Sequence, residues 1–206
     1  MDSHTFSPAE RAIFRRLTTP EKIQCFLDDL VYNKEIDGET CRSPRRVLRD
    51  RTAHCMEGAL FGAAALGMLG HPPLLLDLEA VRDDDHVLAI FQRQGHWGAI
   101  TKSNYSGLRY REPVYRTLRE LSMSYFHEFF DTHGRKTLRA YSRTLDLRRV
   151  DPALWVTNAG SCWAVHDMIA ALRHYPLVSH AQARALSRRD AHERTAARLV
   201  QYPRRA

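Results

Sequence analysis

The N-terminal quarter of the chain repeats apolar residues at the spacing of helical turns. Ser7 and Glu10 form a capping box ahead of the first apolar positions. Pro20 can occupy the first turn of a second helix. The pattern predicts helix over 7–32 interrupted near Pro20, a polar loop at 33–40, and a short helix followed by a turn within 41–54.

The next segment is small, apolar and almost uncharged. It runs from Thr52 to Leu69 with the sequence TAHCMEGALFGAAALGML. A helix that is apolar all round is a buried helix, and its glycines and alanines let other backbone approach closely. Thr52 is expected to cap this helix, and Gly70 with the following His-Pro-Pro ends it.

Short runs of strand-forming residues follow the buried helix. LLLDLEAV at 74–81 is an apolar strand, and the acidic turn RDDD leads to HVLAIFQR at 86–93. Gln94-Gly95 is expected to form a hairpin turn before HWGAITKS at 96–103. The pattern predicts a helix followed by at least three strands, the last two antiparallel.

The remaining segments add helices around this centre. Helical spacing predicts a helix at 112–130, whereas 137–147 favours extended structure. Further helices are predicted at 162–173 and, capped by Ser179, at 180–200. The sequence thus predicts an α+β fold, with the buried cysteine-bearing helix packed on a small antiparallel sheet and extra helices at both ends. The expected organisation is a core with N-terminal helices at 1–150 and a helical C-terminal extension at 151–206.

Charge and hydropathy narrow the possible partners. The formal net charge is +7, carried mainly by scattered arginines, and no zinc-finger, helix-turn-helix or RNA-binding signature accompanies it. A solvated arginine-rich surface therefore explains the charge better than nucleic-acid binding does. No apolar run reaches eighteen residues, and the N-terminal sixteen residues contain acids but no apolar signal core. We expect a cytoplasmic protein without a membrane partner; its oligomeric state stays open.

One cysteine stands out among four. Cys25, Cys41, Cys55 and Cys162 are far apart and form no CxxC, so neither a zinc ribbon nor a disulfide scaffold is predicted. Cys55 falls in the opening turn of the buried helix, where free N–H groups and the helix dipole favour a thiolate and can hold an oxyanion. The alternative is a small buried residue with no chemical role.

His86 is the histidine best placed to act on this thiol. It opens a strand directly after the acidic turn, where it can serve as a general base; the alternative is an ordinary surface histidine. His54 is expected to point away from Cys55, and His71 lies in the helix-ending turn. A third group should orient the imidazole through its second nitrogen. Asn104 is favoured on chemical grounds, with Thr101 and Ser103 as the other candidates.

This order of parts resembles the transglutaminase-like superfamily of papain-like fold, and in particular an uncharacterised bacterial branch of it. The likeness covers roughly 41–130 and rests on the cysteine-bearing helix, the Leu-Gly-His-Pro-Pro that ends it, and His86 followed by Gly-His-Trp at 95–97. It implies Cys55 as nucleophile and His86 as base. The family's third residue, an aspartate on the next strand, is missing: Thr101 stands four residues after Trp97, and Asn104 is the nearest chemical substitute.

The resemblance implies acyl transfer at an amide or ester carbonyl through a thioester, with no metal or organic cofactor. The first hypothesis is therefore a cysteine hydrolase, peptidase or amidase, whose substrate is a peptide or another amide. A catalytically idle member of the fold that binds a peptide or protein is the second hypothesis, because the aspartate is missing and acids precede His86. A nucleic-acid-binding accessory protein is third.

Overall fold

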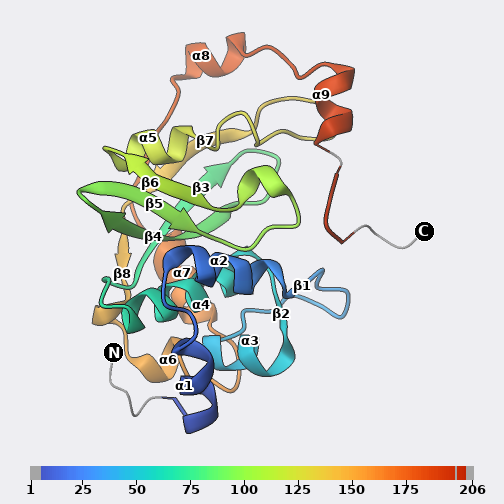
Figure 1. Ribbon diagram of the computed structural model, residues 1–206. Coiled ribbons are helices and arrows are strands. Elements are labelled where there is room, and N and C mark those ends of the chain that lie inside the picture. The colour runs from blue at the N-terminus through green and yellow to red at the C-terminus, as the bar shows by residue number, and fades with distance from the viewer. Residues whose placement is uncertain (1–5, 198, 203–206) are drawn as a thin grey trace.

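The structure, a computed structural model, describes residues 6–197 and 199–202 and is organised around a seven-stranded antiparallel sheet (Figure 1). The strand order is β6-β5-β4-β3-β7-β9, and β8 also pairs with β3. The strands are β3 (Leu74–Ala80), β4 (His86–Arg93), β5 (His96–Ile100), β6 (Arg111–Tyr115), β7 (Leu138–Ser142), β8 (Leu145–Asp146) and β9 (His174–Pro176). A separate parallel pair joins β1 (Val31–Tyr32) to β2 (Thr52–Ala53). The predicted α+β class is confirmed.

The three predicted central strands and their hairpin are also present. In β3 and β4, Leu78 lies opposite His86, so the histidine begins its strand at one end of the ladder. Gln94 and Gly95 both have positive φ, 52° and 76°, which matches the right-handed twist of the β4–β5 hairpin. The segment 137–147, expected to be extended, forms β7 and β8.

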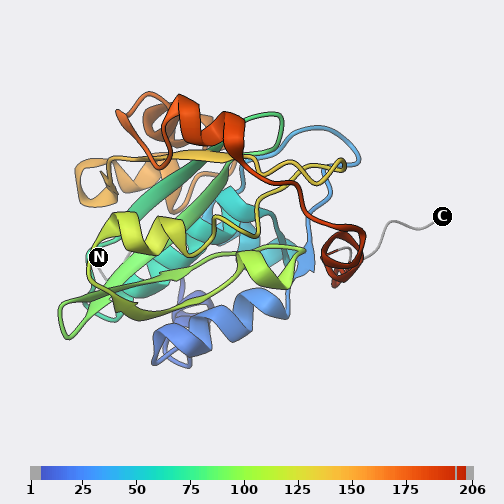
Figure 2. The ribbon, with the colours of Figure 1, turned by 90° about the horizontal axis from the view of Figure 1, so that it is seen from above.

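Helices cover both faces of the sheet (Figures 1 and 2). One core lies between the sheet and α4, with residues of α1, α2, α3, α6 and α7 around it; the other lies under α5. The helices are α1 (Pro8–Phe14), α2 (Pro20–Asp28), α3 (Pro44–Asp50), α4 (Cys55–Met68), α5 (Leu118–Met123), α6 (Pro152–Trp155), α7 (Trp163–Ala170), α8 (His180–Ala185) and α9 (Ala191–Ala196). Two 3₁₀ turns, η1 (Ser106–Leu108) and η2 (Leu147–Arg149), complete the chain.

Two glycines let α4 sit directly on the strands. A Cβ added at Gly58 would lie 2.5 Å from the Cβ of Lys102, and one at Gly62 would lie 3.1 Å from the Cβ of Ala89. A Cβ at Gly58 would therefore force the helix away from the chain that follows β5. Lys102 is itself buried, and its ammonium donates to the carbonyl of Leu30 at 2.6 Å, just beyond the end of α2.

Three expectations from the sequence are wrong in detail. The segment 112–130, predicted to be one helix, forms the end of β6 and the short α5 instead. Pro113 is tolerated in β6 because this strand lies at the edge of the sheet, where no partner strand needs the N–H that proline lacks. The single helix at 180–200 is two helices, since Asp190 caps a new helix by accepting from Glu193 N at 2.8 Å. Thr52 belongs to β2, and His54 occupies the N-cap of α4.

The C-terminal part of the chain packs against the core and adds a strand to the sheet. α6 and α7 contribute to the core under the sheet, and β9 pairs with β7. Farther on, Val200 forms a bridge with Tyr105, so the segment 199–202 lies against the loop after β5. None of the helices in the described ranges is long and apolar enough to cross a membrane.

Candidate active site

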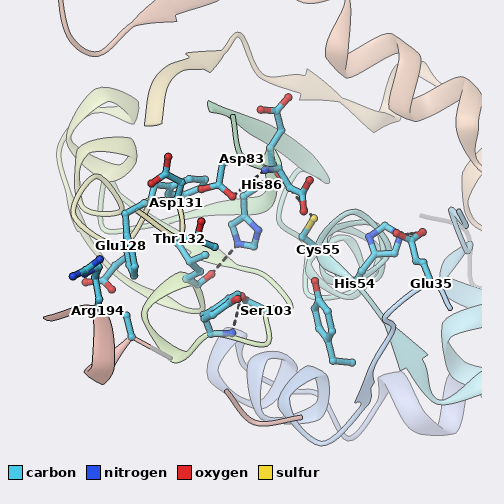
Figure 3. A pocket seen from close by; sticks show the side chains of 18 residues that line it. Glu35, His54, Cys55, Asp83, His86, Ser103, Glu128, Asp131, Thr132 and Arg194 are labelled. Carbon is cyan, nitrogen blue, oxygen red and sulfur yellow. Dashed lines mark hydrogen bonds and ion pairs between the residues drawn. The ribbon is translucent and has the colours of Figure 1, made fainter. Parts of the chain in front are cut away.

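A pocket of about 330 Å³ opens at the N-terminus of α4 (Figure 3). It is lined by parts of six segments: β1 with the loop that follows it, the start of α4, the 83–86 turn, the loop around η1, the 128–132 loop and α9 with the residue after it. Cys55 lies between the rings of His54 and His86 in this pocket. The structure thus brings together the predicted thiol and imidazole and adds a second histidine.

Cys55 is the first residue of α4 and is partly exposed. Its own N–H is among the first-turn donors that the helix leaves without an internal acceptor. Burial opposes ionisation of the thiol, but hydrogen bonding to His54 and His86 and the charges of both rings lower its pKa to about 5. At neutral pH the side chain is therefore a thiolate, the nucleophilic form of cysteine.

His54 contradicts the expectation that it points away from Cys55. Its Nε2 donates to the carbonyl of Thr40 at 2.8 Å, which leaves Nδ1 as the ring nitrogen free for the thiol. Burial disfavours the imidazolium, yet the hydrogen bond and charge of Cys55, together with the charge of Glu57, raise the pKa of His54 to about 9. Because His54 precedes the helix at the N-cap, its ring does not follow helical side-chain directions; this is why spacing within the helix misplaced it.

Glu57 holds this corner of the pocket. Its side chain is fully buried, and its carboxylate accepts from the backbone N–H groups of His54 and Arg42 at 3.0 and 2.9 Å. It also accepts from the side chains of Thr40, Asn33 and Arg42. Burial alone would raise the pKa of Glu57, but the charge of His54 and these donors lower it below its usual value. A buried anion therefore supports the positive charge on His54.

His86 is held in one orientation. The ring is 5% exposed, and its Nε2 lies 2.8 Å from the carbonyl of Leu108 in η1. A carbonyl only accepts, so Nε2 carries the proton and Nδ1 is left to face the pocket. The hydroxyl of Thr101 lies 3.3 Å from the same nitrogen and donates to the carbonyl of Val87 at 2.8 Å, so it too can accept from Nε2.

Of the three candidates for orienting His86, Thr101 is the one that the structure brings to the ring. Asn104 is turned away: its amide donates to the carbonyl of Tyr202 at 3.1 Å and accepts from Tyr202 N at 2.8 Å. Ser103 lines the pocket, and its hydroxyl accepts from Tyr105 N. The principal acceptor, the Leu108 carbonyl, is a backbone atom that no side-chain pattern reveals.

Tyr32 adds a hydroxyl to the pocket. Burial, followed by the negative charge of Cys55, raises the pKa of this phenol above its ordinary value. The group therefore stays protonated and can act as a hydrogen-bond donor in the pocket.

A second buried acid–histidine pair joins β3 to β9. Asp77 Oδ2 lies 3.1 Å from His174 Nε2, whereas Oδ1 has no hydrogen-bond partner. Burial and then the charge of Asp85 raise the pKa of Asp77 to about 6. This pair does not line the pocket.

No protein-family model matches the chain, and no curated protein is similar to it. Within the described ranges, no group of three or more histidine, cysteine or acidic side chains is arranged to hold a metal ion.

Proposed function

We propose that the protein is a thiol-dependent acyl-transfer enzyme, most simply a cysteine hydrolase acting on a peptide or another amide. One observation carries the proposal: a partly exposed cysteine begins a buried helix, in a pocket, between two imidazoles. A residue with no chemical role needs neither histidine beside it.

Cys55 would be the nucleophile and His86 the proton carrier. The thiolate attacks the carbonyl carbon, and the electron pair of the C=O bond moves to oxygen. Nδ1 of His86 has taken the proton of the Cys55 thiol before this attack. As the oxyanion re-forms the C=O bond and the C–N bond breaks, Nδ1 gives that proton to the leaving amine, which leaves a thioester on Cys55. Water then attacks the thioester, Nδ1 takes up its proton, and the acid product leaves with the thiolate restored. Throughout the reaction Nε2 of His86 keeps its own proton, which it donates in hydrogen bonds to the Leu108 carbonyl and the Thr101 hydroxyl.

Two donors are available for the oxyanion. The N–H of Cys55 lies at the positive end of the 14-residue α4, and the Tyr32 hydroxyl lines the same pocket. His54 has a different part: as an imidazolium paired with the thiolate and supported by Glu57, it keeps the sulfur ionised before substrate arrives.

The first test is the alkylation of Cys55 by iodoacetamide as a function of pH, followed by mass spectrometry. We expect the rate to stay high down to about pH 5, far below the titration of an ordinary thiol near pH 8.5. The exposed Cys25 is an internal control in the same sample. A Cys55 that reacts no faster than Cys25 at pH 6 would contradict the proposal.

The second test is turnover on a peptide and ester library with wild type, Cys55→Ser and His86→Ala. Hydrolysis is expected to vanish in Cys55→Ser and to fall about 10²- to 10⁴-fold in His86→Ala. A reactive thiol without turnover on any acyl compound would favour the alternative, a catalytically idle fold that binds a peptide. The carbonyl and hydroxyl that stand in place of a carboxylate beside His86 make that alternative worth testing.

A further inference from the structure

The pocket continues past His86 into a strongly acidic region. On the side of His86 away from Cys55 lie Asp83, Glu128 and Asp131 (Figure 3). The described residues that line the pocket include six carboxylates and a single arginine or lysine, Arg194: the acids are Glu35, Asp83, Asp84, Asp85, Glu128 and Asp131. The chain as a whole has a formal charge of +7, so the pocket is an acidic hollow in a basic protein.

Part of this negative charge is already compensated. Asp131 pairs with Arg135 at 2.6 Å, and Glu35 lies 3.5 Å from Nε2 of His54, the imidazolium beside Cys55. Two other acids are less engaged. Asp84 is exposed, and Glu128 has Arg189 only at 3.8 Å. Their charge remains available to a ligand.

The acids also act on one another. Burial raises the pKa of Asp83, and the neighbouring charges of Asp84 and Asp131 raise it further, against the hydrogen bond from Thr137. Burial is the larger cause of this shift, and the smaller part that comes from Asp84 and Asp131 reflects a negative potential at Asp83 that a cation would relieve.

Aromatic rings share the pocket with these acids. Tyr32, Tyr105, Phe129 and Phe130 line it together with the carboxylates. The face of an aromatic ring attracts a cation, and the combination of rings and carboxylates suits an ammonium or guanidinium group on an apolar stem. An acidic side chain would be repelled by the carboxylates, and an apolar one would gain nothing from them.

We propose that this pocket recognises a positively charged side chain, an ammonium or guanidinium, next to the carbonyl that Cys55 attacks. The attack itself rests on the proposed function; the charge preference rests on the pocket lining. The pocket volume of about 330 Å³ lies at the lower end of the range for ligand sites. The chain's own Arg194, from α9, already lies at this acidic end (Figure 3).

The test measures the potential at the sulfur without requiring turnover. Cys55 is modified with three methanethiosulfonates of similar size that carry a trimethylammonium, no charge or a sulfonate, and the rate at each cysteine is followed by mass spectrometry. Rates at Cys25 in the same chain correct for the intrinsic reactivity of the reagents. We expect the cationic reagent to exceed the anionic one at Cys55 by at least about tenfold after this correction, and less at high salt.

Charge variants assign the effect to the pocket. Asp84→Asn with Glu128→Gln is expected to reduce the cation-to-anion ratio severalfold, whereas Arg194→Gln should increase it. The matched control, Glu112→Gln with Asp167→Asn, removes two acids outside the pocket and should leave the ratio unchanged. Unfolding midpoints show whether each variant is folded.

Equal corrected rates for the three reagents would overturn the proposal, as would a ratio that the control pair lowers as much as the pocket pair. Both results are independent of whether the protein hydrolyses anything. If turnover is found, peptides with lysine or arginine before the cleaved bond should be preferred over those with norleucine by kcat/KM, and loss of that preference in the Asp84/Glu128 variant links the potential to the substrate.

Discussion

Cys55 and His54 are coupled through a shared charge. With pKa values of about 5 and about 9, the two residues form a thiolate–imidazolium pair between those pH values. His54→Gln is expected to raise the pKa of Cys55 toward the ordinary thiol value, because the hydrogen bond with His54 lowers this pKa more than the one with His86 does. Thiolate absorbance at 240 nm as a function of pH measures the shift.

A histidine outside the pocket provides the control for this variant. His71→Gln should leave the titration of Cys55 unchanged, since His71 does not line the pocket. If the titration of Cys55 is unchanged in His54→Gln as well, His86 alone lowers the pKa of the thiol and His54 has no part in its ionisation.

The Tyr32 hydroxyl gives a second prediction at a single atom. If it donates to the oxyanion, Tyr32→Phe should lower kcat by about tenfold to a hundredfold with little change in KM, because the bond strengthens as charge develops. The titration of Cys55 should change only slightly. A rise in KM at constant kcat would instead assign the hydroxyl to ground-state binding.

Among the secondary-structure elements, α4 depends on a glycine for its distance from the sheet. Gly58→Ala would gain about 1 kcal/mol of helix propensity, yet its Cβ would meet Lys102 at 2.5 Å. We expect a net loss of about 1–3 kcal/mol in the free energy of unfolding. Gly160→Ala, which meets only the side chain of Asn158 at 3.3 Å, is the control, and urea denaturation compares them. A stabilised Gly58→Ala would show that the helix can shift without cost.

The β3–β9 pair predicts a pH dependence of stability. The folded-state pKa of Asp77, about 6, is above its ordinary value of 3.8, so the folded protein binds more protons than the unfolded chain between those values. Stability due to this carboxyl is therefore greatest in acid and falls as pH rises from about 4 to 6, by at most about 3 kcal/mol.

Asp77→Asn removes that contribution while keeping a hydrogen bond. His174 Nδ1 lies 2.8 Å from the carbonyl of Leu172, so in the neutral ring Nε2 can accept from the new amide. The difference in unfolding free energy, variant minus wild type, should become more positive between pH 4 and 7. Asp167→Asn, at an exposed position, should give a flat difference; a flat difference for Asp77→Asn too would contradict the assignment.

How much could be predicted from the sequence also differs from element to element. The small-residue, almost uncharged α4 and the β4–β5 hairpin could be predicted because each follows a strong local rule, burial of a small-residue helix and a Gln-Gly turn. The segment 112–130 failed because its helical spacing competes with pairing to β5, which only the folded sheet supplies. In the site, Cys55 and His86 could be found from position, whereas His54 depends on N-cap geometry and Leu108 on the path of a loop.

For the whole molecule, the most informative element is the C-terminal one. Arg194 and Ala197 line the pocket, and the segment 199–202 is tied to the loop after β5 through Asn104 and Tyr105. α8 and α9 contain no buried residues. A chain ending at Arg189 should therefore remain folded, with a midpoint lowered by only a few degrees, and its Cys55 should react severalfold faster with iodoacetamide.

The same experiment controls itself through Cys25, whose rate should not change on truncation. Loss of cooperative unfolding would show that the last seventeen residues are part of the core, and an unchanged rate at Cys55 would show that they do not limit access to the sulfur.

The acceptor for His86 is a main-chain oxygen, and this affects how the site can evolve. Any residue at position 108 supplies the same carbonyl, so substitutions there are tolerated by the imidazole as long as the turn keeps its course. Insertions or deletions between Thr101 and Arg111 would move the oxygen and are the changes that selection should remove. In homologous sequences we therefore expect the Leu108 carbonyl to be preserved through a constant loop length and not through an invariant residue at position 108.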